Sequence, residues 1–105
     1  MLQRIWRCWV DPDRIGEYEE FARTISIPMF QAHSGYRGCV MARRRHDCEV
    51  LTLWSDEAAI EALEVSPLYR ATVAKIRNAG FIHEEVGTTI MRIHALDLGH
   101  GFTAP

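Results

Sequence analysis

The sequence lacks the marks of a secreted or membrane protein. Its 105 residues hold only three cysteines, Cys8, Cys39 and Cys48, with no CxxC spacing between them. An odd number of cysteines at such spacings argues against a disulfide framework and a zinc knuckle, and it predicts free thiols in a reducing compartment. No segment approaches the roughly 18 apolar residues of a membrane span. Arg4 and Arg7 interrupt the apolar N-terminal run, so no signal peptide is predicted and we expect a cytoplasmic protein without a membrane partner.

An excess of charge of one sign is also missing. The formal net charge is -2, and the one basic run, residues 43–46, is short and adjoins turn-like residues. A solvated hairpin tip explains that run better than a phosphate-binding surface, so we expect no nucleic-acid partner. The chain is 48% hydrophobic and 25% charged, which is typical of a folded globular protein. We predict one domain over residues 1–105, with residues 97–105 as a Gly-rich tail.

Apolar periodicity predicts the order strand, helix, strand, strand, helix pair, strand. Asp11-Pro12, Ser55 and Ser66-Pro67 are typical helix starts, whereas Gly35 and Gly80 are typical helix ends. Pro28 lies within the first helical pattern and predicts a kink near residues 25–27. This order is the split β-α-β-β-α-β arrangement of the α+β class, in which helices cover one face of an antiparallel sheet. We expect strands at residues 2–10, 36–44, 49–54 and 88–96, and helices at residues 12–33, 56–64 and 67–79.

The predicted strands are apolar on both faces. In the first strand Trp6 and Trp9 point to opposite sides, and in the third strand Leu53 and Trp54 do the same. Helices on one side of the sheet leave the other apolar face uncovered, and such a face is unusual for a soluble monomer. We therefore predict a homodimer in which two copies pack sheet against sheet.

Three short motifs resemble one known family. They are Ile5-Trp6-Arg7 before a helix, the segment 35–38 (Gly-Tyr-Arg-Gly) entering the second strand, and the segment 51–55 (Leu-Thr-Leu-Trp-Ser) before an acidic helix start. Over roughly residues 2–96 the sequence is similar to the antibiotic biosynthesis monooxygenase (ABM) family of the dimeric α+β barrel superfamily. The resemblance implies a ferredoxin-like fold that dimerises through its sheets, with a pocket between sheet and helices in each subunit.

Members of this family differ in their chemistry. Some are cofactor-independent oxygenases acting on polyketide-like aromatic substrates, others bind and degrade haem, and many have no known activity. The haem-degrading branch uses an asparagine, a tryptophan and an iron-ligating histidine, and this sequence has Arg7, Leu63 and Val73 at the matching positions. The resemblance therefore implies an oxygenase without a cofactor or metal rather than haem degradation of that type.

Arg7 is the candidate for stabilising a substrate anion. It shares a strand face with Trp9, and if that face points at the helices both side chains enter the pocket. The alternative is a structural ion pair between Arg7 and a helix carboxylate such as Glu17 or Glu20.

Further candidates are aromatic and histidine side chains. Trp9, Tyr36 and Trp54 are candidates to stack on an aromatic substrate, although aromatics at strand positions are more often core residues. Of the histidines, His83 is the candidate proton acceptor and His94 is a candidate to line the cavity. For each of them the alternative is a structural role. With these residues as candidates, the resemblance implies a monooxygenase acting on a small aromatic or polyketide-like substrate. Two alternatives stay open: a non-catalytic small-molecule binder, and a haem binder with His83 or His94 as ligand.

Overall fold

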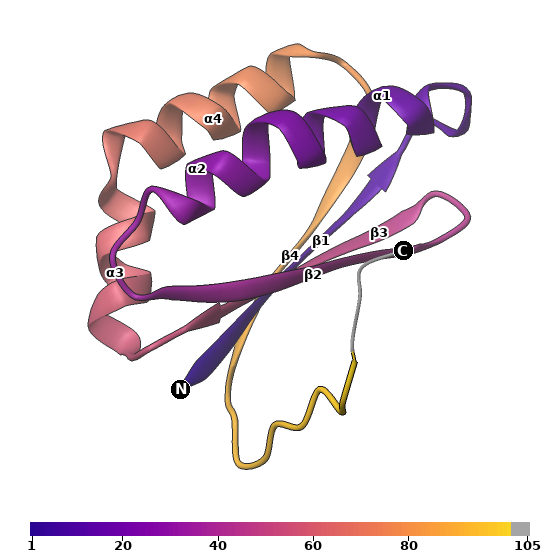
Figure 1. Ribbon diagram of the computed structural model, residues 1–105. Helices are drawn as coiled ribbons and strands as arrows, with labels where there is room; N and C mark the ends of the chain where they lie inside the picture. Colours follow the sequence, from indigo (N-terminus) through magenta and orange to yellow (C-terminus); the bar gives the residue numbers. More distant parts are fainter. Residues whose placement is uncertain (102–105) are drawn as a thin grey trace.

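The four helices α1 to α4 lie on one side of a four-stranded antiparallel sheet (Figure 1). This arrangement is seen in a computed structural model that describes residues 1–101. The sheet order is β2-β3-β1-β4, so the first strand lies inside the sheet and the last strand forms one edge. The predicted α+β, ferredoxin-like fold is confirmed. The strands are β1 (Leu2–Val10), β2 (Tyr36–Arg44), β3 (Asp47–Trp54) and β4 (Ile82–Arg92).

Strand alternation separates a helix-facing side of the sheet from an open face. In β1 the even-numbered residues from Leu2 to Val10 point toward the helices, and four of these five side chains are buried. The odd-numbered residues of β1 lie on the open face, together with Leu51 and Leu53 of β3 and Val40 of β2, their neighbours in the strand register. Val40 is exposed and the two leucines are half-buried. The sheet is therefore apolar on both faces, as the sequence predicts.

The first helical segment is one rod with an irregular middle. A short 3-10 turn (Pro12–Arg14) leads into α1 (Ile15–Phe21), a π-helical turn (Ala22–Ser26) and α2 (Ile27–Gln31). Figure 1 shows these pieces following one another without a break. Pro28 lacks the N–H of a regular helix, and the wider turn directly before it relieves the crowding that its ring imposes. The predicted kink near residues 25–27 therefore takes the form of a π-helical turn.

Two capped helices follow the β2-β3 hairpin. The N-terminus of α3 (Glu57–Val65) is capped by Asp56, whose carboxylate accepts the Ala59 N–H at 2.9 Å. The predicted cap, Ser55, is wrong by one residue, because the Ser55 N–H is still bonded to the Gly35 carbonyl at 2.9 Å and continues the extended chain. Ser66 caps α4 (Pro67–Asn78) as predicted, accepting the Tyr69 N–H at 3.3 Å.

Gly35 has a left-handed backbone and a close neighbour. Its φ is +88°, and a Cβ atom there would lie 2.5 Å from Ala59 Cβ and 2.9 Å from Ser55 Oγ. We expect Gly35→Ala to lower the free energy of unfolding by about 1–3 kcal/mol, since both the strain and the overlap must be relieved. Gly16→Ala is the matched control: a Cβ at Gly16, in α1, meets nothing within 4 Å. That change is expected to raise stability by about 0.4–1 kcal/mol. Urea unfolding measures both, and a Gly35→Ala chain as stable as the parent would contradict this account.

The core consists of two clusters on the helix-facing side. One is centred on Trp54, Phe30 and Leu63, and the other on Phe81 and Phe21. Trp6 is half-buried and packs against both clusters. The helices therefore cover the two ends of the sheet well, with Trp6 at the junction between them.

The cysteines are free, in agreement with the prediction from their number. Cys8 and Cys48 are buried cross-strand neighbours in β1 and β3, whereas Cys39 is half-buried. Burial raises the pKa of the Cys8 thiol to about 12, with a smaller contribution from the neighbouring Cys48. The Cys8 thiol is therefore protonated and unreactive at neutral pH.

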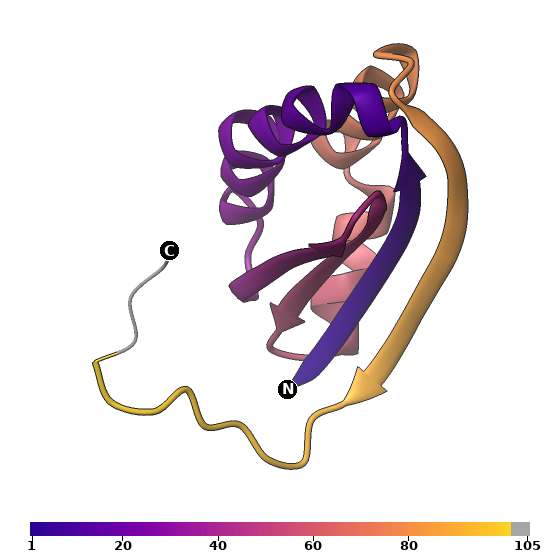
Figure 2. The same cartoon turned by 90° about the vertical axis from the view of Figure 1, so that its right-hand side faces the viewer.

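The last strand differs from its predicted span of 88–96. β4 begins at Ile82 and ends at Arg92, and it forms the outer edge of the sheet (Figure 2). Its residues beyond Ile82 are exposed. An exposed edge strand does not require alternating apolar residues. The start of β4 contains the charged residues Glu84 and Glu85, so the apolar pattern did not indicate a strand there. The predicted tail begins after this strand, and residues 102–105 of it lie outside the described residues. Within residues 1–101, each helix is too short or too polar to span a membrane.

Candidate active site

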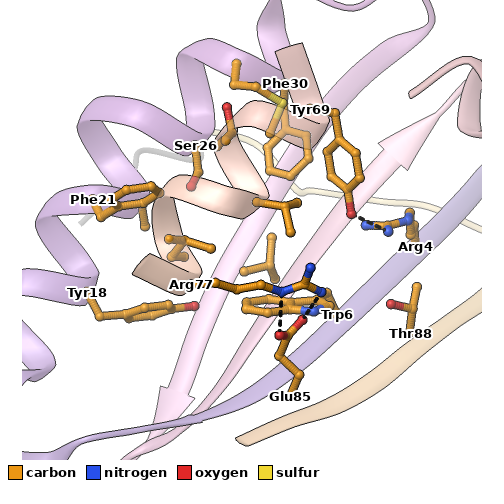
Figure 3. A pocket seen from close by; sticks show the side chains of 16 residues that line it. Arg4, Trp6, Tyr18, Phe21, Ser26, Phe30, Tyr69, Arg77, Glu85 and Thr88 are labelled. Carbon is orange, nitrogen blue, oxygen red and sulfur yellow. Dashed lines mark hydrogen bonds and ion pairs between the residues drawn. The ribbon is translucent and has the colours of Figure 1, made fainter. Parts of the chain in front are cut away.

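A cavity of about 160 Å³ lies between the helices and the sheet. Its walls come from β1, β3, β4, α4 and the rod formed by α1, the π-helical turn and α2 (Figure 3). The cavity lies between the two core clusters, with Trp6 as part of its lining. Most of the lining is apolar, as in typical small-molecule sites. Its apolar members include Trp6, Phe21, Met29, Phe30, Val50, Val73 and Ile76.

Arg4 is the charged group in the wall nearest the start of β1. Its side chain is almost buried, with the residue only 6% exposed. The guanidinium donates through Nη2 to the Tyr69 hydroxyl at 2.8 Å, and through Nε and Nη2 to Glu64 at 3.4 Å. Because these bonds use Nε and Nη2, the N–H donors of Nη1 are available to a ligand. Arg4, which is ion-paired with the partly exposed Glu64, therefore presents free N–H donors to a mostly apolar cavity.

A second charged group lies at the solvent-exposed edge of the cavity, between α4 and β4. Arg77 of α4 donates to both carboxylate oxygens of Glu85 in β4, at 2.7 and 2.9 Å. Figure 3 shows this pair beside the indole of Trp6. Arg77 holds the pKa of the Glu85 carboxyl below its usual range, and Trp6 adds a smaller effect in the same direction. Glu85 is therefore a stable carboxylate at neutral pH and a poor proton acceptor.

The π-helical turn and the start of α1 shape the opposite wall. Ala22 and Ser26, the first and last residues of the turn, both line the cavity, as does Tyr18 of α1. Burial is the main cause that raises the pKa of the Tyr18 hydroxyl well above its ordinary value. Tyr18 is thus a neutral hydroxyl at physiological pH. The wall combines apolar carbon with neutral hydroxyl groups and carries no charge of its own.

Comparison with known proteins yields structural relatives alone. No family model and no curated protein matches the sequence. The structure is similar to NE2512, a protein of unknown function from Nitrosomonas europaea, with a TM-score of 0.76, 19% identity and 95% of each chain covered. It is also similar to SnoaB, a cofactor-independent oxygenase from Streptomyces nogalater, with a TM-score of 0.70, 14% identity, and 90% of this chain and 94% of that chain covered.

A third similar structure is a Deinococcus radiodurans protein provisionally described as an antibiotic biosynthesis monooxygenase. Its TM-score is 0.75 at 8% identity, covering 94% of this chain and 99% of that chain. The chain has the ABM fold. The resemblance stated from the sequence motifs is thus confirmed at the level of the fold.

Within the ABM fold, Arg7 and Trp9 lie on the open face of the sheet. The sequence placed both residues in the pocket only if this strand face points at the helices. It points away from them, so that placement is wrong. Arg7 donates to Glu49 of the neighbouring strand at 3.2 Å, an exposed ion pair different from the predicted pairing with Glu17 or Glu20. Neither Arg7 nor Trp9 lines the cavity. Arg4, which the sequence reasoning missed, takes the position expected of Arg7.

Trp54 and Tyr36 belong to the core cluster of this structure or pack against it. Trp54 is 0% exposed, and its Nε1–H donates to Thr52 Oγ1 at 2.8 Å. Tyr36 stacks on Phe30 with ring centroids 6.2 Å apart and meets the Trp54 ring at 5.6 Å. Neither residue lines the cavity, so the core alternative describes both better than substrate stacking.

His83 and His94 also lie away from the cavity. The side chain of His83 is 57% exposed, with Nε2 at 3.8 Å from Asp11 Oδ2, and His94 is exposed just beyond β4. In residues 1–101 no group of three or more His, Cys, Asp or Glu side chains is arranged to hold a metal ion. Neither His83 nor His94 therefore lines the cavity, and neither can contact a ligand bound in it.

Proposed function

We propose that this protein is a cofactor-independent monooxygenase acting on a small phenol-type aromatic in the cavity. The observation that carries the proposal is Arg4, a nearly buried guanidinium with free donors in the wall of an apolar cavity. A cation in that position favours a phenolate over a phenol, because an opposite charge lowers the pKa of a neighbouring acid. The structural likeness to SnoaB, a cofactor-independent oxygenase, supports the same reaction class.

The chemistry needs only the substrate and oxygen. The bound phenolate transfers one electron to O₂, and the resulting substrate radical and superoxide combine to form a C–O bond at a ring carbon that carries hydrogen. The O–O bond then breaks, one oxygen atom stays as a new carbonyl, and the other leaves as water with the phenolic and ring protons. All four electrons come from the substrate, which becomes a quinone. The reaction therefore needs no external reductant.

The residues of the cavity have distinct tasks in this scheme. Arg4 holds the substrate oxyanion, and the Tyr69 hydroxyl, to which Arg4 donates, fixes the guanidinium in place. Trp6 and Phe30 contribute flat apolar surface against which an aromatic ring packs. Apolar walls also keep water from the radical pair while admitting dioxygen. Arg4 thus replaces Arg7 as the anion-stabilising residue.

Oxygen uptake tests the function. The parent protein is mixed with a panel of one- and two-ring phenols and quinols, and oxygen consumption is recorded with quinone formation. Uptake above buffer with one quinone formed per O₂, one ¹⁸O atom from ¹⁸O₂ in that quinone and no hydrogen peroxide supports a monooxygenase. Saturable binding without oxygen uptake instead supports the alternative, a small-molecule binder without turnover.

We also propose that two copies pack through the open faces of their sheets. Leu51 lies near the middle of that face, paired in register with Ile5 and Val40, and the charged residues next to them, Arg7 and Glu49, are paired with each other. Burial of this face gives an interface of about 1,600 Å² or more in total. The proposal rests on the apolar side chains of the open face, which a soluble protein usually covers.

Sedimentation at micromolar concentration tests this dimer. The parent chain is expected to be dimeric and Leu51→Lys monomeric, because a buried unpaired charge at the centre of the interface is costly. Val65→Lys is the control, since Val65 is 63% exposed at the end of α3 and is not part of the sheet. A monomeric parent chain, or a Leu51→Lys chain that still dimerises, would contradict the proposal.

A further inference from the structure

We propose that the cavity selects a single aromatic ring with an anionic group at one end and a hydrogen-bond donor at the other. The anionic group binds Arg4, and the donor binds Glu85. The inference rests on the proposed function in using the same cavity, but it concerns binding alone. It assigns Glu85 and its partner Arg77 a role in ligand selection.

The two charged groups lie at separate points along the paired strands β1 and β4. Arg4, Trp6 and Cys8 follow one another on the helix-facing side of β1, and Glu85 is the cross-strand neighbour of Cys8. Arg4 and Cys8 are four residues apart, which corresponds to about 13 Å along a strand. Both charged side chains line the cavity, with Trp6 between their backbone positions. A ligand that reaches both is therefore aligned with β1 and packs on Trp6.

The two ends demand opposite polar groups. A guanidinium only donates hydrogen bonds, so Arg4 requires an acceptor and prefers an anion. An ionised carboxylate only accepts, and Glu85 uses its two oxygens for one bond each from Arg77. Each oxygen has a second lone pair, so Glu85 can still accept from a ligand hydroxyl or amine. The reversed ligand would place its donor against the Arg4 guanidinium, which offers no acceptor, and its anion beside the Glu85 carboxylate, whose charge Arg77 partly offsets, so this orientation is disfavoured.

The size of the cavity limits the ligand to one ring. Its volume is about 160 Å³. An engineered protein cavity of about 150 Å³ binds benzene, so one ring fills this space. Two substituents in para positions extend from such a ring in opposite directions, as the positions of Arg4 and Glu85 require. A meta pair diverges at a smaller angle and cannot address both groups equally well.

Calorimetry under nitrogen, with four benzoates as probes, tests the ligand class without turnover. The probes are 4-hydroxybenzoate, 3-hydroxybenzoate, 4-methoxybenzoate and benzoate. All carry the carboxylate, but only the first combines a donor with the para position. We expect 4-hydroxybenzoate to bind about tenfold more tightly than the other three, the factor expected of one hydrogen bond to a charged acceptor. Equal affinities for 4-hydroxybenzoate and benzoate would overturn the proposal.

Substitutions show whether Glu85 is the source of that preference. Glu85→Ala is expected to abolish the tenfold advantage of 4-hydroxybenzoate over benzoate, and Glu85→Gln to reduce it. Glu84→Ala is the matched control, because Glu84 is paired with Trp9 on the open face and should keep the full advantage. An advantage that survives Glu85→Ala, or that disappears in Glu84→Ala, counts against the inference.

The ligand class and the reaction class can fail separately. Selective binding of the para-hydroxy probe without oxygen uptake by any phenol would support this inference and contradict the monooxygenase. Oxygen uptake with no para selectivity among the benzoates would do the reverse. Arg4→Gln adds an internal check, since it should weaken all four benzoates by a similar factor, whereas a loss confined to one probe would contradict the assignment of the anionic end.

Discussion

Replacing Arg4 with glutamine is expected to lower kcat/KM for oxygen uptake about 100- to 1,000-fold. This is the usual effect of removing one donor that stabilises a developing oxyanion. Arg4 is almost buried and faces an apolar cavity. In the variant, water in this cavity therefore stabilises the substrate oxyanion much less than the guanidinium does. The substitution leaves Glu64 partly exposed to solvent, so the fold tolerates the loss of the ion pair. Steady-state oxygen consumption with the best substrate of the phenol panel measures the effect.

The pH profile of the same reaction gives a second readout. A guanidinium beside the substrate oxygen lowers the pKa of the bound phenol, so turnover rises with pH once that phenol ionises. Removing the charge raises the pKa of the bound phenol. The rising limb of the Arg4→Gln profile is therefore expected at higher pH than in the parent protein, and part of the lost activity returns in alkaline buffer.

Arg7→Gln is the matched control for Arg4→Gln. Arg7 is three residues away on the same strand, but it lies on the open face and is paired with Glu49. We expect activity within about twofold of the parent, since Arg7 lies on the opposite face of the sheet from the cavity and does not line it. Equal losses in the two variants, or full activity in a folded Arg4→Gln protein, would rule out the assigned role of Arg4. Circular dichroism establishes that each variant is folded.

Trp54→Ala is expected to lower the free energy of unfolding by about 3–5 kcal/mol, the usual cost of deleting a buried large aromatic side chain. Trp54 is fully buried and contacts the rings of Phe30 and Tyr36. A loss of this size is a large fraction of the stability of a small domain, which is typically about 5–15 kcal/mol. Urea unfolding followed by circular dichroism measures it.

Two further variants separate packing from hydrogen bonding at this position. Trp54→Phe keeps much of the ring but removes the Nε1–H that donates to Thr52, so a smaller loss of about 1–3 kcal/mol is expected. Val65→Ala, at an exposed site of α3, should change stability by less than about 0.5 kcal/mol. If Trp54→Ala unfolds at the same urea concentration as the parent but loses ligand affinity, Trp54 is a binding residue and the core assignment is wrong.

The architecture could be predicted because local signals agreed with one another. Ser66-Pro67 and Gly80 bound α4 as expected, and Pro28 marked the irregular turn of the first helical rod. The helix predicted at residues 67–79 contains Tyr69, which lines the cavity. Such signals act over a few residues and do not depend on the rest of the fold. β4 was placed poorly for the opposite reason, because an exposed edge strand is held by pairing with β1.

The candidate site could be predicted only in part, because alternation alone does not say which face of the sheet the helices cover. Arg4 and Trp6 share one face, and Arg7 and Trp9 share the other. Each face offers an arginine beside a tryptophan, so the pattern is nearly symmetrical. The decision depends on the packing of the helices, which bury Leu2, Cys8 and Val10. Arg4 was detectable as a charged residue among those positions, but its partners Glu64 and Tyr69 are about sixty residues away in sequence.

β4 has a consequence for how the protein should be stored and handled. The strand is long, exposed and at the edge of the sheet, and it carries the apolar side chains of Val86, Ile90 and Met91. Unpaired edge strands of this kind template intermolecular pairing and aggregation. The same strand supplies Glu85 and Thr88 to the cavity wall. A cavity ligand that contacts Glu85 therefore also restrains this edge. Adding such a ligand should slow aggregation of the purified protein during storage.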